Sequence, residues 1–389
     1  MIMGKELSLY IHVPFCVRKC LYCDFLSFNC KAGEIKSYFN ALDAEIAMAC
    51  NSYRDFTIKS IFFGGGTPSF VDSAHICNTL EHIRENFQVD VNAEISIEVN
   101  PASAILDKLT DYRRAGINRI SIGAQSLNDG ELKKIGRAHN SAMFYETFAN
   151  ARKAGFDNIN IDIMSALPDQ TMDSYMETLE KVVSLGPEHI SAYSLIVEEG
   201  TPFYDMDLNL PDEDTDRQMY HETRRFLAQN GYHRYEISNY AKGSDGDKTC
   251  ECYHNKVYWR RGNYLGLGLG ASSMTDDSRW KNISDFNLYQ SILLDNTSFL
   301  DKFHQLRTEF EKLSRSDCME EFMFLGLRLV EGVSISEFKS LFGRDIYDVY
   351  GKIIEKYISE ELLEQNGDHI RLTETGMDVS NTVMADFLF

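Results

Sequence analysis

The chain has 389 residues, 43% of them hydrophobic and 25% charged, which is enough apolar material for one large domain and a smaller one. It contains only 7 Pro and 25 Gly, so the composition excludes a disordered, collagen-like or linker-dominated chain. The formal net charge is −20, with 39 basic against 59 acidic residues. Because proteins that follow a phosphate backbone are basic, this charge predicts no nucleic-acid partner and no adsorption to anionic lipid.

The sequence predicts neither a membrane span nor a signal peptide. No run approaches the roughly 20 apolar residues of a span, and residues 1–10 lack the charged-then-apolar order of a signal. We therefore expect a cytoplasmic protein. Its nine cysteines are an odd number in an acidic chain, so we expect no disulfide framework. Three of them lie within eight residues, which indicates metal or redox chemistry.

Short β-branched runs alternate with longer amphipathic stretches in the first half of the chain. The predicted strands are Leu7–Val13, Lys59–Phe63, Ala93–Val99, Asn118–Gly123, Asn158–Met164 and His189–Leu195. The predicted helices are Glu34–Asn51, Ser73–Phe87, Ser103–Ala115, Ala142–Ala154 and Met172–Leu185. Such βα units, repeated about every 30 residues, predict an α/β fold, a partial (β/α)6 barrel or a doubly wound sheet. Polar residues at the carboxyl ends of the strands then surround the site.

Local composition divides the chain into three parts. Residues 1–240 are predicted to form the α/β barrel, residues 241–310 a connecting segment, and residues 311–389 a C-terminal domain. The last part contains three helical stretches, a hairpin over Leu363–Leu372 and a final helix, an order that is typical of a winged helix. Its acidic composition favours packing against protein over binding DNA.

The cysteine cluster follows the first predicted strand as Cys16-x3-Cys20-x2-Cys23. Three thiolates at this spacing can ligate three irons of a [4Fe–4S] cubane and leave the fourth iron open. Zinc is the alternative, and it needs a fourth ligand that Cys30 could supply. The remaining alternative is three unrelated buried thiols.

This arrangement resembles the radical S-adenosylmethionine (SAM) superfamily. The resemblance implies that the open iron of the cluster binds SAM and that an electron donor is required if the cofactor is cleaved. The sequence Gly64-Gly65-Gly66-Thr67-Pro68 follows the second strand and resembles the superfamily's glycine motif for the methionine amino group. Glycine lets the backbone approach a ligand closely, although such a run can also be a tight turn.

Further motifs resemble the oxygen-independent coproporphyrinogen III oxidase family over nearly the whole chain. The run from Tyr10 to Cys16, YIHVPFC, matches its first motif, in which the tyrosine contacts the cofactor. Polar residues at or near later strand ends match its cofactor-binding positions, and carboxylates suit ribose hydroxyls as Arg suits a carboxylate. The cofactor residues implied are Tyr10, Gly65, Gly66, Thr67, Glu98, Gln125, Arg137 and Asp162.

Two departures separate the chain from the oxidase of that family. The oxidase carries another cysteine two positions after its third cluster ligand, where this sequence has Phe25. It also has an N-terminal extension, whereas Tyr10 comes almost at once in this sequence. Both differences argue against coproporphyrinogen decarboxylation and leave enzymatic activity uncertain.

The segment His254-Asn255-Lys256-Val257-Tyr258-Trp259 resembles the HNxxYW motif of the family's heme chaperone branch, the HemW type. The resemblance implies that His254 contacts heme, with Arg260 and Arg261 as possible partners for its propionates. The alternative is a hydrogen-bonded histidine beside a strand. Cys250 and Cys252 are either further ligands or incidental thiols.

The run from Gly266 to Ala271 satisfies the GxGxxA pattern, but no helix is predicted after it, so we do not expect a nicotinamide site. We predict a heme chaperone that carries a [4Fe–4S] cluster and SAM and delivers heme to an acceptor hemoprotein. The alternative is radical decarboxylation of coproporphyrinogen III.

Overall fold

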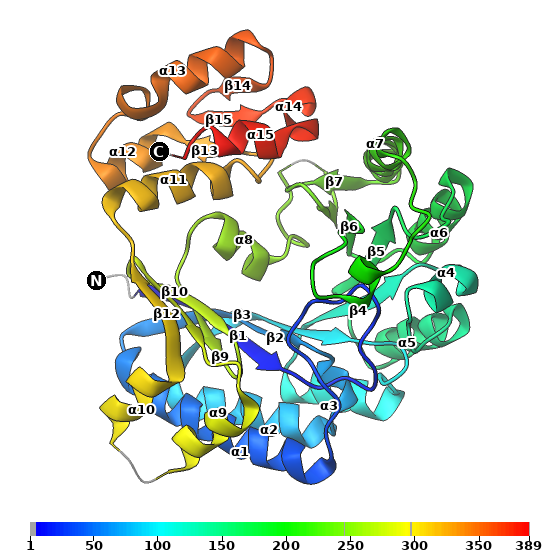
Figure 1. Ribbon diagram of the computed structural model, residues 1–389, viewed down its shortest axis with the longest axis vertical. Helices are drawn as coiled ribbons and strands as arrows, with labels where there is room; N and C mark the ends of the chain where they lie inside the picture. The colour runs from blue at the N-terminus through cyan, green and yellow to red at the C-terminus, as the bar shows by residue number, and fades with distance from the viewer. Residues whose placement is uncertain (1–4, 245, 296–297, 389) are drawn as a thin grey trace.

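The computed structural model describes residues 5–244, 246–295 and 298–388. Its centre is an open, curved sheet with the strand order β12-β11-β10-β9-β1-β2-β3-β4-β5-β6-β8-β7 (Figure 1). Strands β1 to β6 are parallel and neighbour one another in chain order, which confirms the predicted partial barrel. They are β1 (Lys5–Val13), β2 (Phe56–Gly65), β3 (Gln88–Val99), β4 (Arg119–Gln125), β5 (Ile159–Ser165) and β6 (His189–Ser194).

The crossover helices cover the outer face of this sheet (Figure 1). They are α1 (Ala32–Ala49), α2 (Ser73–Asn86), α3 (Leu106–Ala115), α4 (Asp129–Lys134), α5 (Ser141–Lys153) and α6 (Met172–Ser184). Short 3-10 turns lie at η1 (Cys50–Ser52), η2 (Pro68–Phe70) and η3 (Pro202–Asp205). Alternate residues of the strands, such as Ile159, Ile161 and Ile163, are fully buried, and this packing fixes the register of the sheet.

The segment after β6 extends the sheet and forms one of its edges. Helix α7 (Glu213–Gln229) leads into the antiparallel strands β7 (Tyr232–Arg234) and β8 (Asn239–Lys242), and β8 pairs with β6. Helix α8 (Tyr253–Trp259) then enters the concave side of the sheet, where it contacts β2 and helix α11 (Arg315–Gly326) (Figure 1). The predicted HNxxYW motif therefore lies inside the fold.

The segment predicted as a connection adds strands to the other edge of the sheet. These are β9 (Tyr264–Leu267), β10 (Ser272–Thr275), β11 (Ser278–Asn282) and β12 (Arg307–Lys312), with helices α9 (Phe286–Leu294) and α10 (Phe299–Leu306) before the last strand. The glycine-rich run after β9 leads into β10, and Gly268, at φ +103°, donates its N–H to Glu45 Oε2 at 2.8 Å. This run is a close approach to α1 without the βα context of a nicotinamide site.

The C-terminal part has its own hydrophobic core, which includes Phe338, Tyr350 and Phe387. It contains α11, β13 (Val333–Ser334), α12 (Ile335–Phe342), α13 (Ile346–Ser359), β14 (Leu363–Asn366), β15 (His369–Leu372), α14 (Glu374–Asp378) and α15 (Ser380–Ala385). Strands β14 and β15 are the predicted hairpin, and two short helices stand where one final helix was predicted. The Val330 N–H donates to the Tyr235 carbonyl at 2.9 Å and joins this part to the segment after β7.

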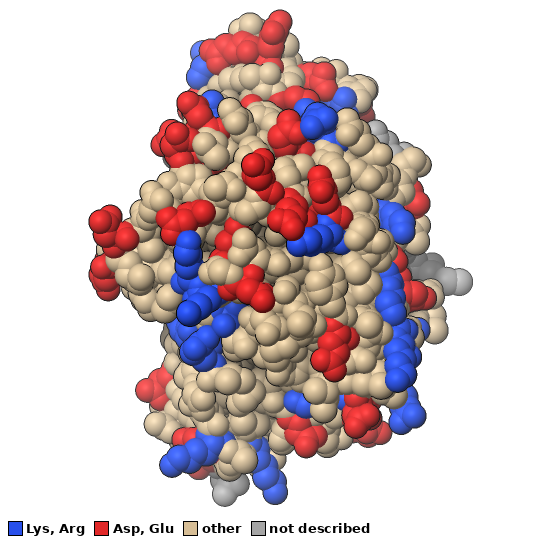
Figure 2. Space-filling model, turned by 90° about the vertical axis from the view of Figure 1, so that its right-hand side faces the viewer, with Lys and Arg blue, Asp and Glu red and all other residues tan. Residues whose placement is uncertain are grey.

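Acidic side chains are spread over the face on the side of α4, α6 and α7, and they separate the basic ones into small groups (Figure 2). This surface agrees with the net charge of −20. Within residues 5–388, as far as the structure describes them, no helix is long and apolar enough to cross a membrane.

Candidate functional site

The cysteine-bearing loop between β1 and α1 has almost no regular secondary structure. Backbone hydrogen bonds to other residues hold it in place. The Cys16 N–H donates to the Phe28 carbonyl at 3.1 Å, and the Phe28 N–H donates to the Pro14 carbonyl at 2.9 Å. The Leu21 N–H donates to the Ile135 carbonyl at 3.1 Å. The loop is thus fixed to the β1 end and to the segment after β4.

One pocket brings this loop together with the carboxyl ends of the parallel strands. Its lining includes Cys16, Cys20, Cys23, Gly65, Gly66, Thr67, Glu98, Gln125, Arg137 and Asp162. Parallel strands present their carboxyl ends at the same edge of a sheet, which explains the convergence. Of the residues that the sequence predicted for the site, Tyr10 and His254 lie outside this lining.

The three thiols are arranged to ligate three different irons of one cluster and not a single metal ion. In the described ranges, no three His, Cys, Asp or Glu side chains come close enough to hold one metal ion. A cubane does not require that convergence, because each thiolate binds a different iron. Burial raises the pKa of the Cys23 thiol to about 11, so a positive metal centre is needed to stabilise its thiolate.

Two half-buried carboxyl groups face the pocket from β3 and β5. Burial raises the pKa of Glu98 to about 8, and the nearby Asp162 carboxylate adds to the rise. Asp162 accepts hydrogen bonds from Ser121 Oγ at 2.9 Å and Asn160 Nδ2 at 2.8 Å, and burial raises its pKa as well. Glu98 accepts one bond, from the Gly65 N–H at 3.2 Å, and so retains capacity for a ligand.

Arg137 contributes positive charge to the pocket, which Arg18 and Lys19 also line. Its Nη2 donates to the Gly123 carbonyl at 2.6 Å, and its Nη1 lies 3.7 Å from Cys20 Sγ. Its Nε is buried and has no hydrogen-bond partner among the described residues. A buried guanidinium N–H without an acceptor fits a ligand carboxylate, as the methionine part of SAM would supply.

The glycine turn after β2 is required by close packing with the protein itself. A Cβ on Gly65, at φ +116°, would lie 2.6 Å from the His12 ring. A Cβ on Gly66 would lie 2.8 Å from the Phe15 carbonyl oxygen and 3.1 Å from Cys16 Sγ. The close approach at Gly65 is to His12 of β1 and that at Gly66 is to the cysteine loop, while the predicted contact of these glycines with a ligand stays a prediction.

Aromatic residues that the sequence interpretation did not include complete the lining. Tyr193, near the end of β6, donates its hydroxyl to Gln125 Oε1 at 3.0 Å, and Gln125 itself has a φ of +64°. Tyr22 lies between two of the cysteines and also faces the pocket. Tyr193 lies at a predicted strand end, the same signal that identified Glu98, and it could have been found by that criterion.

Tyr10 lies beside the pocket, on β1. Its hydroxyl is 3.1 Å from His12 Nδ1, while His12 Nε2 is 2.9 Å from the Leu26 carbonyl. Since Nε2 must donate to a carbonyl, His12 Nδ1 accepts from Tyr10. Burial lowers the pKa of His12, which keeps the imidazole neutral and able to tie Tyr10 to the far end of the cysteine loop.

His254 is 1% exposed, on α8. Its Nδ1 is 2.8 Å from Ser60 Oγ, its Nε2 is 2.8 Å from the Tyr258 hydroxyl, and its ring stacks on Phe62 at 5.1 Å. Both ring nitrogens are therefore engaged within the protein, as in the alternative of a hydrogen-bonded histidine beside a strand.

The residues around the HNxxYW motif are also paired within the protein. Arg260 forms an ion pair with Glu331, and Arg261 forms one with Glu321 at 2.9 Å. Burial raises the pKa of the Cys252 thiol to about 12, which makes it a poor ligand or nucleophile.

Comparisons with known proteins identify the family of this chain. Residues 10–182 match the Radical SAM superfamily, and residues 313–379 match the HemN C-terminal domain. The chain is 34% identical to the heme chaperone HemW of Lactococcus lactis, over 99% of this chain and 98% of that protein. It is 32% identical to the heme chaperone HemW of Escherichia coli, over the full length of both. The chain belongs to the HemW-type branch of the HemN family.

A solved relative supports the same family at the level of the fold. The coproporphyrinogen III oxidase HemN of Escherichia coli superimposes with a TM-score of 0.84 and 26% identity, covering 99% of this chain and 90% of that one. Membership of the radical SAM superfamily implies a [4Fe–4S] cluster and SAM. Phe25, which stands where the oxidase has its extra cysteine, is 63% exposed and lines the cysteine pocket.

Proposed function

We propose that this protein is a heme chaperone, which binds heme and transfers it to an acceptor hemoprotein. The observation that carries the proposal is similarity along the whole chain, at 32–34% identity, to proteins named heme chaperone HemW. The similarity includes the C-terminal part and α8 as well as the radical SAM portion. All nine cysteines are free thiols, which suits a reducing compartment such as the cytoplasm.

In this proposal the cysteine pocket holds the resident cofactors. Cys16, Cys20 and Cys23 would ligate the cluster, which supplies an open iron site and a low-potential electron when bound. Arg137 would bind the SAM carboxylate through its unpartnered Nε, and Glu98 would accept from the amino group or a ribose hydroxyl. Thr67, Gly65 and Gly66 shape the wall beside Cys16, whose Sγ is 3.3 Å from Thr67 Oγ1.

The second candidate function is oxidative decarboxylation of coproporphyrinogen III, favoured by the structural similarity to HemN. Phe25 opposes it. A phenyl ring has no proton or hydrogen atom to exchange as a thiol does, and no described residue near Phe25 in the pocket lining supplies an additional thiol beyond the three cluster cysteines.

His254 would bind heme only after α8 releases it from Ser60 and Tyr258. As the structure stands, its hydrogen bonds fix α8 against β2, so we assign His254 the role of positioning α8. Heme then requires a different ligand, which is considered below.

A transfer experiment tests the proposed function. Heme-loaded protein is mixed with the heme-free form of a b-type cytochrome, and the Soret band of the acceptor is followed by stopped flow. Direct handover predicts a rate that rises with acceptor concentration, whereas heme lost first to solvent gives a rate that does not. Failure of the protein to bind heme at all would refute the proposal.

A further inference from the structure

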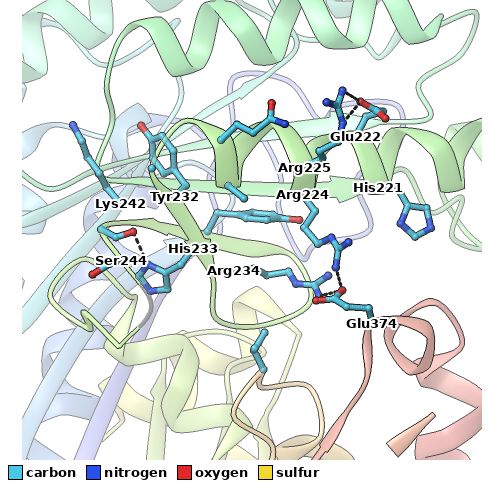
Figure 3. Close-up of a pocket in the computed structure, with 16 residues that line it drawn as sticks. His221, Glu222, Arg224, Arg225, Tyr232, His233, Arg234, Lys242, Ser244 and Glu374 are labelled. Atoms are coloured by element: carbon cyan, nitrogen blue, oxygen red, sulfur yellow. Dashed lines mark hydrogen bonds and ion pairs between the residues drawn. The ribbon is translucent and has the colours of Figure 1, made fainter. Parts of the chain in front are cut away.

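A second, larger cavity lies between α7, the β7–β8 hairpin and the C-terminal part. This groove has a volume of about 1080 Å³, and its lining shares no residue with the cysteine pocket. Its size is at the upper end of the roughly 300–1,000 Å³ of small-molecule sites, which is sufficient for a large flat ligand. We call it the α7 groove, and Figure 3 shows the side chains that line it.

The α7 groove gathers basic side chains in a chain whose net charge is −20. Its charged lining residues are Arg224, Arg225, Arg234, Lys242, Glu222 and Glu374. Four cations against two carboxylates leave an excess of two positive charges. This excess matches a ligand that carries two carboxylates, because paired carboxylates are the groups that Arg and Lys bind most readily.

Helix α7 places an imidazole on the same side as two of these cations. His221, Arg224, Arg225 and Ala228 are spaced by three, four and seven residues, so they lie on one face of the helix. All of them line the groove, as do Tyr232 and Val330, which add apolar atoms to the lining. A basic helix face that also bears an imidazole and shares its groove with apolar atoms suits a porphyrin dicarboxylate.

His221 has the environment of a metal-ligating histidine. Its Nε2 lies 3.2 Å from Asp378 Oδ2, in α14, and its side chain is 42% exposed. Metal-binding histidines commonly have a carboxylate beside one ring nitrogen, and Asp378 lies in this place at an ion-pair distance from His221. The other nitrogen of His221 has no hydrogen-bond partner in the part of the chain that the structure describes. In this respect His221 differs from His254, whose two ring nitrogens are both occupied.

Carboxylates of the protein already pair with the arginines of the groove, and Arg225 forms an ion pair with Glu222 on α7 itself. Glu374, at the start of α14, lies between Arg224 and Arg234, with 2.8 Å to Arg234 Nη2 (Figure 3). The Arg234 side chain is 6% exposed, whereas that of Glu374 is 64% exposed. The buried guanidinium is therefore fixed in place, and its partner is a solvent-accessible carboxylate that a ligand carboxylate can replace.

We propose that the α7 groove is the heme site of this protein, with His221 as the axial ligand and the heme propionates on Arg224, Arg225 and Lys242. The inference rests on the proposed heme chaperone function. A propionate that takes Arg224 displaces Glu374 and so loosens the contact between α7 and the C-terminal part. Heme binding would thereby be coupled to the position of the C-terminal part, which bears Glu374.

The test is a titration of the full chain with ferric heme, followed by the Soret band and by electron paramagnetic resonance. His221→Ala is compared with His82→Ala, because His82 forms a similar pair with Asp43 at 3.3 Å on α2, away from the groove. We expect His221→Ala to bind heme at least about tenfold more weakly and to lose the imidazole signature. Added imidazole should restore that signature, and His82→Ala should behave as wild type.

The outcomes distinguish failure of the proposed heme site from failure of the proposed chaperone function. If wild type, His221→Ala and His82→Ala bind heme equally, the groove is not the site, although the chaperone function stands. If wild type itself binds no heme, both proposals fail.

A second arm does not depend on His221. Wild type should prefer heme over heme dimethyl ester by about tenfold, and the double variant Arg225→Gln, Lys242→Gln should lose most of that preference. Lys181→Gln, which removes an exposed i,i+4 ion pair with Glu177 elsewhere, is the matched control. An unchanged preference in the double variant would overturn the placement of the propionates.

Discussion

The Gly65 N–H donates a hydrogen bond of 3.2 Å to Glu98 Oε2 and joins the turn after β2 to the end of β3. Gly65 has a φ of +116°, a conformation that favours glycine, and the turn brings its N–H toward the neighbouring strand. The bond places a half-buried carboxyl group beside the loop that carries the cysteines. Glu98 is therefore the residue through which cofactor affinity and pH dependence are most directly tested.

Glu98→Ala should weaken SAM binding by about 5- to 150-fold, because a polar group of the cofactor would lose its partner at a cost of roughly 1–3 kcal/mol. The measurement is a SAM titration of anaerobically reconstituted protein, with iron content determined in parallel. Glu85→Ala, on the exposed side of α2, is the control and should leave the titration unchanged. A wild-type titration for Glu98→Ala would remove this residue from the cofactor site.

The raised pKa of Glu98 predicts how stability depends on pH. The folded chain keeps this proton until about pH 8, whereas the ordinary pKa of the group is 4.5. Between these values the folded state binds more protons than the unfolded state, so the free energy of unfolding falls as pH rises. Glu98→Gln has no proton to lose, and its melting temperature should therefore fall less than that of wild type between about pH 5 and pH 8.

Thermal melts of cofactor-free protein at several pH values check this result, with Glu85→Gln as a variant that should follow wild type. An identical pH slope in wild type and Glu98→Gln would show that the carboxyl group titrates normally.

Gly66→Ala should disturb the cluster through the protein backbone. Its new Cβ would lie 2.8 Å from the Phe15 carbonyl oxygen and 3.1 Å from Cys16 Sγ, so the first ligand must move. We expect iron well below the about four atoms per chain of a reconstituted cubane, a loss approaching that of Cys16→Ala. Gly33→Ala is the control, because no atom lies within 4 Å of its added Cβ. Full iron content in Gly66→Ala would mean that the cysteine loop tolerates the displacement.

His254→Ala should affect stability more than heme binding. The substitution leaves the Tyr258 hydroxyl without its buried partner and leaves Ser60 with Ser8 alone, which costs roughly 1–3 kcal/mol of unfolding free energy. Denaturant unfolding measures this loss, and a heme titration of the folded variant should match wild type. A stable His254→Ala protein with weakened heme affinity would instead make His254 the heme ligand.

The strands and the cysteine pocket could be predicted because their signals are local. The β-branched runs that became β1 to β6 are buried. Glu98 and Gln125 lie at or near the ends of their strands, and Asp162 lies in the middle of β5. Helix α4 was not predicted, since its six residues, DGELKK, are too short and polar to show a period. Its start is fixed by the Asn128 side chain, which caps two backbone N–H groups.

The environments of His254 and His221 could not be predicted, because residues distant in the chain create them. His254 Nδ1 meets the hydroxyl of Ser60, which lies 194 residues earlier in the chain, because α8 enters the concave side of the sheet. His221 acquires Asp378 only when the C-terminal part packs against α7. The HNxxYW motif identified His254, whereas no motif pointed to His221, and for both residues the availability of a ring nitrogen for a ligand depends on tertiary packing.

The most direct test of the central claim compares two activities in one anaerobically reconstituted preparation that contains cluster and SAM. One aliquot is titrated with heme, and the other is incubated with coproporphyrinogen III and a chemical reductant while protoporphyrinogen is measured. A heme chaperone with Phe25 in its cofactor pocket predicts saturable binding of one heme per chain and no protoporphyrinogen. Steady turnover of coproporphyrinogen III without saturable heme binding would contradict the account.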